Sequence, residues 1–426
     1  MPRLLADLTP LRVSPAYRRL WTGNALSSVG TQLTLVAVSL EVYHLTGSSL
    51  YVGLLGLFAV VPLVIAGLYG GAVADAVDRR SVALGSALVL WLSSLAIAAQ
   101  AWAGIENVWV LYALTAVHSG ASGINQPTRG AIIPALVGVK LLPAANALNM
   151  MTMSLSMMAG PLFAGVLVAS IGYAWTYSID VVTFLAALYA LWRLPALPPQ
   201  RPDGTSGEDG AAGTGPARAG LRSVLEGFCF LGTRPNLRMT FLADLVAMFT
   251  AFPRALLPAI GGVILGGDEA TVGVLLAAMA VGAFLIGLFS GPLTRIHRHG
   301  AAVYAAICLW GLSIAAFGVA VWQGQLWPAA VLLVVAGAAD SVSGIFRNTI
   351  LQTATPDHLR GRLQGVFVVV VAGGPRVGEM ITGGASSWLG EPLTLVAGGA
   401  LCVLLVSLLM RLQPGFLRYD ARRPVA

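Results

Sequence analysis

Apolar runs of about 20 residues recur along almost the whole chain, separated by short polar connectors. A run of this length can cross a bilayer as an α-helix, because the helix satisfies its own backbone hydrogen bonds. We count about twelve such runs. The pattern predicts an all-α integral membrane protein with twelve transmembrane helices.

Composition agrees with this class. Of 426 residues, 57% are hydrophobic and 10% are charged, whereas soluble domains carry about 25% charged residues. The net charge is +7, but the sequence has no basic face and no nucleic-acid recognition motif, so we expect no nucleic-acid partner. The three cysteines are far apart and no phosphate-binding loop is present, so we expect no metal or cofactor.

The positive net charge reflects the orientation of the chain in the membrane, because the arginines gather in alternate connectors. They precede the first span, follow the second, surround the central loop, follow the eighth, flank the eleventh and end the chain. The other connectors are acidic or uncharged. Under the positive-inside rule, we expect a multi-pass protein of the plasma membrane with both termini in the cytoplasm.

The chain also repeats itself. Arg129 plus 218 is Arg347, and Gly71 plus 220 is Gly291. An even offset, with both halves starting on the same side, predicts two parallel six-helix bundles and a substrate site between them near the midplane. We expect a lead-in at 1–19, bundles at 20–194 and 235–412, a flexible linker with an amphipathic helix at 195–234, and a tail at 413–426.

A charged turn between the second and third spans carries a motif. Gly71, Asp75, Arg79 and Arg80 match the pattern G-x-x-x-D-R-x-G-R-R, while Ala76 and Asp78 depart from it. This pattern resembles the loop between helices 2 and 3 of the major facilitator superfamily of secondary transporters. The resemblance implies a gate in which Asp75 meets the start of the eleventh helix, where Arg362 lies.

The fifth span holds Gly160, Pro161 and Gly165, which resemble the G-P-x-x-G-G signature of proton-antiporting drug exporters, with Ala164 in place of one glycine. Gly374, Pro375 and Gly378 lie at the equivalent place in the eleventh span. We expect both sets to allow close helix packing. Further segments carry a resemblance to one branch of the superfamily: residues 14–21 and 27–30, the block that joins the fourth and fifth spans, and residues 354–362. They resemble the branch that contains catecholate siderophore exporters and drug efflux proteins, which implies an exporter.

The first span carries a polar stripe, which would be costly facing lipid. Its members are Asn24, Ser27, Ser28, Thr31, Gln32 and Thr34. Each of these side chains either bonds a neighbouring helix or contacts substrate. Our candidates for the substrate cavity are Asn24, Ser28, Thr31, Gln32, Arg254 and Arg376.

Several further charges fall inside spans. Arg129, Arg347 and Asp244 lie close to the expected cytoplasmic ends, where we expect them to reach the membrane surface. Arg376 and Glu379 are three residues apart, so they share a helix face and either neutralise each other or leave Glu379 to carry a proton. The candidates for proton coupling are Asp180, Asp340, Glu379 and Glu41.

These observations predict a secondary transporter and not an enzyme, since no catalytic pair can be assembled. We expect a monomeric, proton-coupled exporter of siderophore-like or bulky amphipathic small molecules, working by alternating access in the lipid bilayer. An importer of a small solute or a non-transporting membrane scaffold are the alternatives.

Overall fold

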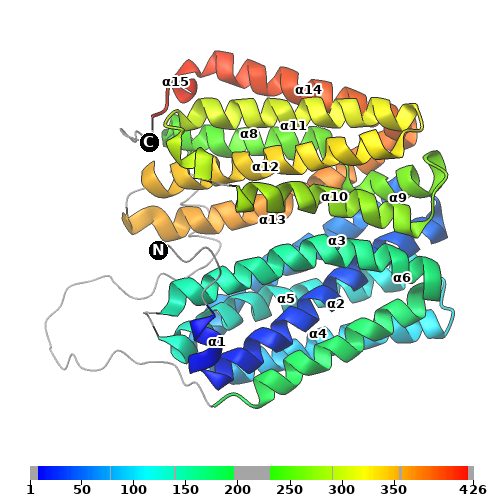
Figure 1. Cartoon of the computed structure of the whole chain (residues 1–426), viewed down its shortest axis with the longest axis vertical. Coiled ribbons are helices and arrows are strands. Elements are labelled where there is room, and N and C mark those ends of the chain that lie inside the picture. The colour runs from blue at the N-terminus through cyan, green and yellow to red at the C-terminus, as the bar shows by residue number, and fades with distance from the viewer. Residues whose placement is uncertain are drawn as a thin grey trace, which may run out of the picture.

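The computed structural model describes residues 8–76, 78–138, 141–195, 231–289, 291–354 and 357–420, and these form helices without a strand. Figure 1 shows two bundles side by side, one from each half of the chain. The first half forms α1 (Thr9–Val13), α2 (Pro15–Thr46), α3 (Ser49–Ala76), α4 (Arg79–Trp102), α5 (Val108–Val137) and α6 (Leu142–Trp192). Helix α2 begins at Pro15, so the end of the expected lead-in is part of the first span.

The second half begins with α8 (Pro235–Ala251), which continues through the short turns η2 (Arg254–Leu256), α9 (Leu257–Ala259) and η3 (Ile260–Ile264). It goes on with α10 (Glu269–Leu288), η4 (Gly291–Arg295), α11 (His299–Trp322), α12 (Leu326–Ala354), α13 (Asp357–Leu389), α14 (Glu391–Leu412) and α15 (Pro414–Leu417). Most of the expected linker, residues 196–230, lies outside the described residues.

The number of spans follows from these helices. Nine described helices are long and apolar enough to cross a membrane. Helix α6 counts twice, because its 51 residues turn back at Gly172, whose φ of 79° only glycine adopts easily. Helices α5 and α13, with 30 and 33 residues, complete the twelve. The prediction of an all-α membrane protein with twelve spans is confirmed.

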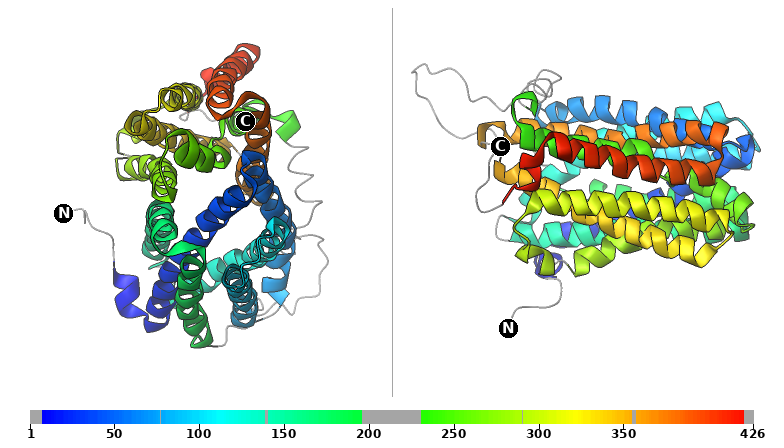
Figure 2. Two further views of the ribbon diagram at one scale, coloured as in Figure 1. Left: turned by 90° about the vertical axis from the view of Figure 1, so that its right-hand side faces the viewer. Right: turned by 90° about the horizontal axis from the view of Figure 1, so that it is seen from above.

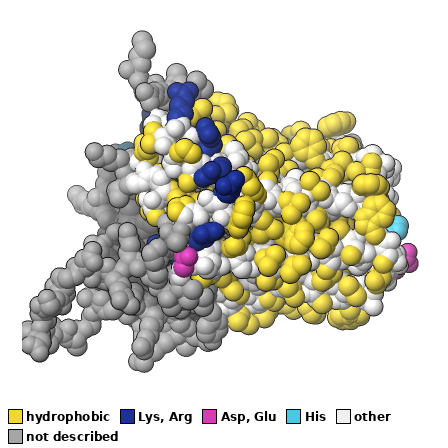
Figure 3. Space-filling model, turned by 90° about the horizontal axis from the view of Figure 1, so that it is seen from below, with side chains coloured by type: hydrophobic (Ala, Val, Ile, Leu, Met, Phe, Trp, Pro, Cys, Tyr) yellow, Lys and Arg dark blue, Asp and Glu magenta, His cyan; other side chains and the backbone are white. Residues whose placement is uncertain are grey.

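The two ends of the bundles differ in charge. Helices α1 and α15 lie at the same end (Figure 1), and arginine side chains gather near one end of the space-filling surface, whose middle is largely apolar (Figure 3). We call this the arginine-rich end, and the opposite end, whose connectors hold Glu106 and Asp268, the acidic end. Exposed tryptophans at helix termini surround the acidic end, as expected at a membrane interface: Trp102, Trp109, Trp175, Trp322, Trp327 and Trp388.

The two halves meet along α3 with α13 and α6 with α10 (Figure 2). Glycines make the approach close near the acidic end. A Cβ on Gly53 would meet the carbonyl oxygen of Glu379, and a Cβ on Gly165 would meet the backbone of α10 at Glu269. Ser49 Oγ also donates to Glu391 Oε1 over 3.1 Å. The halves are therefore in direct contact on the acidic side.

Candidate functional site

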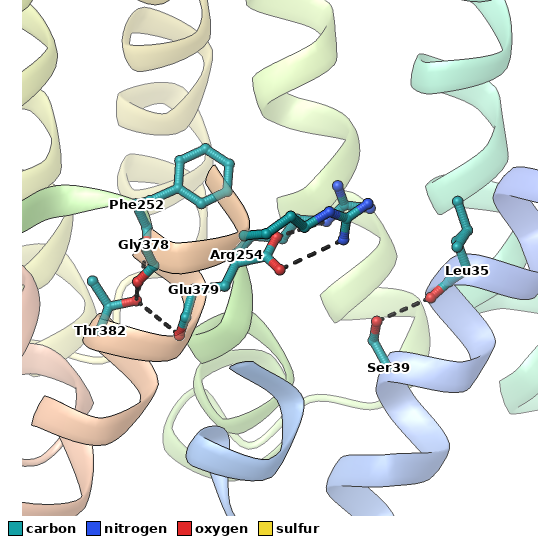
Figure 4. Close-up of polar contacts among 8 residues, drawn as sticks. Leu35, Ser39, Phe252, Arg254, Gly378, Glu379 and Thr382 are labelled. Carbon is teal, nitrogen blue, oxygen red and sulfur yellow. Dashed lines mark hydrogen bonds and ion pairs between the residues drawn. The ribbon is translucent and has the colours of Figure 1, made fainter. Parts of the chain in front are cut away.

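The seventh span is interrupted beside the interface between the halves. Helix α8 ends at Ala251, Phe252 is extended, and the chain turns at Pro253 before η2 starts at Arg254. Thr382 Oγ1 on α13 lies 2.9 Å from the carbonyl oxygens of both Phe252 and Gly378 and shares its proton between them (Figure 4). The break thus gains a partner for a carbonyl that the helix has released, and it turns Arg254 toward α13.

Arg254 belongs to a cluster of three charges. Its Nε lies 4.0 Å from Glu379 Oε1, and Arg376 Nη1 lies 3.6 Å from Glu379 Oε2. The Glu379 side chain is 6% exposed, while the arginines are 33% and 28% exposed. One buried carboxylate therefore pairs with two guanidinium groups whose side chains are partly exposed. The cluster has one net positive charge.

This cluster lines a pocket between the two halves. The N-terminal half contributes Leu35 and Ser39 of α2, Gly56 of α3 and Thr115 of α5, and the C-terminal half contributes Val272 and Leu276 of α10. All lining residues lie in the part of their helix nearer the acidic end. Figure 4 shows Arg254 and Glu379 on one side and Leu35 and Ser39 on α2 across from them. With a volume of about 20 Å³, the pocket holds one or two water molecules in this conformation.

The polar stripe of α2 is spread over several faces of the helix. Gly30 packs on α6 at Asp180 and Thr183, and Thr34 points the same way. Asn24, Ser28, Thr31 and Gln32 lie on other faces of the helix and are half-buried. Asn24 accepts a hydrogen bond from Arg129, and Gln32 packs against Gly160. Of the six cavity candidates, Arg254 and Arg376 line the pocket, and the other four do not.

Asp180 lies inside the N-terminal bundle, away from this pocket. Its Oδ2 accepts hydrogen bonds from Thr34 of α2 and Ser94 of α4, each 2.8 Å long. Its Oδ1 is buried and has no hydrogen-bond donor among the described residues. The side chain is fully buried, and no basic group pairs with it in the described part of the chain. Adding a proton to Asp180 would break no ion pair.

Glu41 forms a second network between the same three helices. Its Oε1 accepts a hydrogen bond from Gln100 Nε2 of α4 over 3.0 Å, and its Oε2 accepts one from Tyr177 of α6 over 2.5 Å. Tyr177 lies one turn from Asp180 on α6. Both carboxylates therefore occupy the packing interface of α2, α4 and α6.

Asp340 lies in the C-terminal half beside a tight ion pair. Arg347 Nη1 of α12 lies 2.5 Å from Asp244 Oδ1 of α8, and both side chains are buried. Asp340 Oδ1 lies 4.0 Å from Arg347 Nη2, and the Asp340 side chain is 44% exposed. The expectation that Arg347 and Asp244 reach the membrane surface is wrong, because pairing in the bundle satisfies both charges. Arg129 likewise turns inward, to Asn24.

The gating motif is described in part. Asp78 caps α4, since its Oδ1 accepts a hydrogen bond from the Arg80 backbone over 3.1 Å. Arg80 Nη2 donates to the carbonyl of Trp192 at the end of α6 over 2.6 Å. Arg79 starts α4 beside them. Gly71 and Asp75 lie in α3 and Arg362 in α13, but the side chains of Asp75 and Arg362 are outside the described part of the structure, so their contact stays a prediction.

The glycine motifs lie at close helix contacts. Gly160 faces Gln32 of α2, the carbonyl of Pro161 faces Gly273 of α10, and Gly165 faces α10 as described above. In α13, a Cβ on Gly378 would meet the carbonyl of Met248, whereas a Cβ on Gly374 would make only ordinary contacts with the Met248 side chain. Pro375 lies within α13 between these two glycines.

Sequence reasoning missed Thr382 and Ser39, which complete the site. Pro253 inside an apolar run was an available signal, because proline removes a helix hydrogen bond and frees a carbonyl. Nothing in the sequence indicates that Thr382, from another helix, supplies its partner.

Comparison with known proteins finds similarity along nearly the whole chain. The family model described as "Transmembrane secretion effector" matches residues 5–421. The enterobactin exporter of Citrobacter koseri is 28% identical over 425 residues, which cover 99% of this chain and 97% of that protein. The enterobactin exporter of Salmonella typhi is 28% identical with the same coverage.

Solved structures share the fold. A nucleoside transporter superposes with a TM-score of 0.74 at 12% identity, covering 93% of this chain and all of that one. A bacterial homologue of the iron transporter ferroportin in its inward-facing state gives 0.70 at 14% identity, covering 96% and 99%.

Proposed function

Because the chain belongs to the transmembrane secretion effector family of major facilitator transporters, we propose that it is a proton-coupled exporter of siderophore-like or bulky amphipathic compounds. The pocket between the halves, with Arg254, Arg376 and Glu379, carries this proposal. It lies between the two halves, and transporters built from two repeats bind substrate between their halves while one half rocks against the other. Relatives described as enterobactin exporters, similar over nearly their full length, support the substrate class.

The contacts between the halves support alternating access. On one face of α6, Pro161, Ala164 and Val168 are buried, and this stretch packs against α10. Toward the arginine-rich end, the same face carries Met150, Met153 and Met157, which are 72%, 61% and 45% exposed. This change favours halves that are closed at the acidic end and part toward the other end, which we take as cytoplasmic.

The exposed methionines also favour a bulky apolar substrate. Methionine side chains are flexible and polarisable, so they adapt to aromatic surfaces of different shapes. In the cluster, Arg254 and Arg376 outnumber Glu379, which favours a negatively charged group on the same compound. An amphipathic aromatic anion combines both features, and a catecholate siderophore belongs to this class.

We place the proton at Asp180. Glu379 is a poor site for exchanging a proton against substrate. An anionic substrate that draws Arg254 and Arg376 away from Glu379 would favour proton binding to this carboxylate, so substrate and proton would cross the membrane in the same direction. Asp340 is a poorer candidate than Asp180, because it lies near Arg347, and a nearby cation disfavours proton binding to a carboxylate. Asp180 faces no base in the described residues, and its two hydroxyl partners belong to α2 and α4, so its protonation can alter the packing of three helices.

Transport in inside-out vesicles tests the function. We expect a catecholate siderophore to accumulate when the vesicle interior is acidified, and a protonophore to abolish the accumulation. Vesicles carrying Arg376→Gln serve as a matched control for the pocket. Accumulation that ignores both the pH gradient and this substitution would contradict the proposal.

A further inference from the structure

The two halves repeat one contact between their first and fourth spans. In the C-terminal half, Arg347 of α12 pairs with Asp244 of α8 at 2.5 Å. In the N-terminal half, Arg129 of α5 donates from Nη1 to Asn24 Oδ1 of α2. Arg129 plus 218 is Arg347, and Asn24 plus 220 is Asp244. Equivalent positions therefore make the same contact, with an acid in one half and an amide in the other.

The exchange of acid for amide leaves Arg129 without a carboxylate partner among the described residues. Arg347 is neutralised by Asp244 and has Asp340 at 4.0 Å. Arg129 has the neutral side chain of Asn24, while its Nε and Nη2 find no acceptor in the described residues. A guanidinium inside a span is costly unless an anion balances it. The N-terminal half thus contains the cationic part of an ion pair whose anionic part the described chain does not supply.

The surroundings of Arg129 suit a ligand. Asn24 and Arg129 are half-buried residues, while Nε and Nη2 of the guanidinium are themselves buried, so Nη1, beside Asn24, is the nitrogen that a ligand meets when the amide moves away. Gln126 and Ser122 lie three and seven residues before Arg129, on the same face of α5, and Gln126 is exposed. Both Asn24 and Arg129 lie in the part of their helix nearer the arginine-rich end, below the pocket. An anion entering from that end meets Arg129 before Arg254 and Arg376.

We propose that Arg129 is a second anion-binding site, which receives the charged group of an amphipathic aromatic anion in the place that Asp244 takes in the other half. This inference rests on the proposed function and adds the entry site of its substrate. The ligand displaces the amide of Asn24 and accepts hydrogen bonds from the guanidinium.

The repeat supplies the test. Asn24→Asp gives Arg129 the partner that Arg347 has, so the protein supplies its own anion and the ligand is excluded. Asn24→Ala removes the amide without adding charge. Binding is measured by equilibrium dialysis of the purified protein in an uncharged detergent, with empty micelles as blank. The probes are anilinonaphthalene sulfonate, an aromatic anion, and phenylnaphthylamine, its uncharged analogue.

We expect Asn24→Asp to weaken sulfonate binding about tenfold, the order of one charged hydrogen bond, and Asn24→Ala to leave it nearly unchanged. Phenylnaphthylamine should bind all three proteins alike. Equal sulfonate binding by Asn24→Asp and the unsubstituted protein overturns the inference, as does equal loss of both probes, which indicates a collapsed cavity. Loss of copurified phosphatidylglycerol in Asn24→Asp, with sulfonate binding intact, would assign the site to lipid and also overturn it.

These outcomes are separable from those of the proposed function. Siderophore accumulation in vesicles with unchanged sulfonate binding in Asn24→Asp rejects the Arg129 site alone. Selective loss of sulfonate binding with no accumulation in vesicles supports the site and rejects the exporter. If the unsubstituted protein binds neither probe, the inference fails together with the proposed substrate class.

Discussion

Arg376 lies one turn before Glu379 on α13, and its Nη1 is 3.6 Å from Glu379 Oε2. Arg254, across the break in the seventh span, approaches the other oxygen of the same carboxylate at 4.0 Å. A single acid therefore fixes two cations from different helices at the interface between the halves. Because these three side chains line the pocket, a change in the charge of one of them also changes the walls of the pocket.

Glu379→Gln should destabilise the protein by about 1–3 kcal/mol, because two guanidiniums that are only partly exposed lose their carboxylate. Adding Arg376→Gln should recover part of the loss. Thermal unfolding in detergent measures both variants. If the double variant is no more stable than the single one, the residues do not act as a pair.

Asp180→Asn should leave a folded protein that binds substrate but no longer uses the pH gradient. The amide keeps acceptors for Thr34 and Ser94 but cannot exchange a proton. Siderophore accumulation in vesicles, with and without the gradient, provides the measurement. Asp340→Asn, which changes a more exposed acid near Arg347, is the control and should keep the response. The opposite result would move the coupling site to Asp340.

Asp244→Asn should cost about 3–5 kcal/mol, since it leaves Arg347 buried beside a neutral group. Asp244→Asn combined with Arg347→Met should be more stable than the single variant, because the buried guanidinium is removed and the charge that remains belongs to Asp340, whose side chain is 44% exposed. Unfolding temperatures of the purified variants are compared. A negligible loss in Asp244→Asn would indicate that Asp340 or water replaces the partner.

Gly165→Ala should favour opening at the acidic end, because its Cβ would meet the backbone of α10 where the halves touch. Gly85→Ala on α4, where a Cβ meets nothing within 4 Å, is the matched control. A membrane-impermeant maleimide reports access to Ser39→Cys in the pocket, with the native cysteines replaced. We expect faster labelling in Gly165→Ala alone. Equal labelling of all three proteins would show that this contact does not govern the opening.

The fold could be predicted because the length of each apolar run and the position of each glycine determine local structure: which segments form spanning helices and where two helices can pack closely. The i,i+3 spacing likewise indicated that Arg376 and Glu379 share a face. Arg254 joins them only through the break at Phe252 and Pro253, and Asp180 meets Thr34 and Ser94 only when α2, α4 and α6 pack. The pairing of Arg347 with Asp244 escaped prediction for the same reason, since both partners are set by tertiary packing. The internal repeat aligns Arg129 with Arg347 in the sequence, but it does not show that both side chains turn into their bundles.

The most direct test of a proton-driven exporter is siderophore accumulation in inside-out vesicles at constant ATP, with and without a protonophore. We predict accumulation against the gradient when the interior is acid, and its loss on adding the protonophore. Accumulation that survives the protonophore and stops only when ATP is depleted would contradict proton coupling.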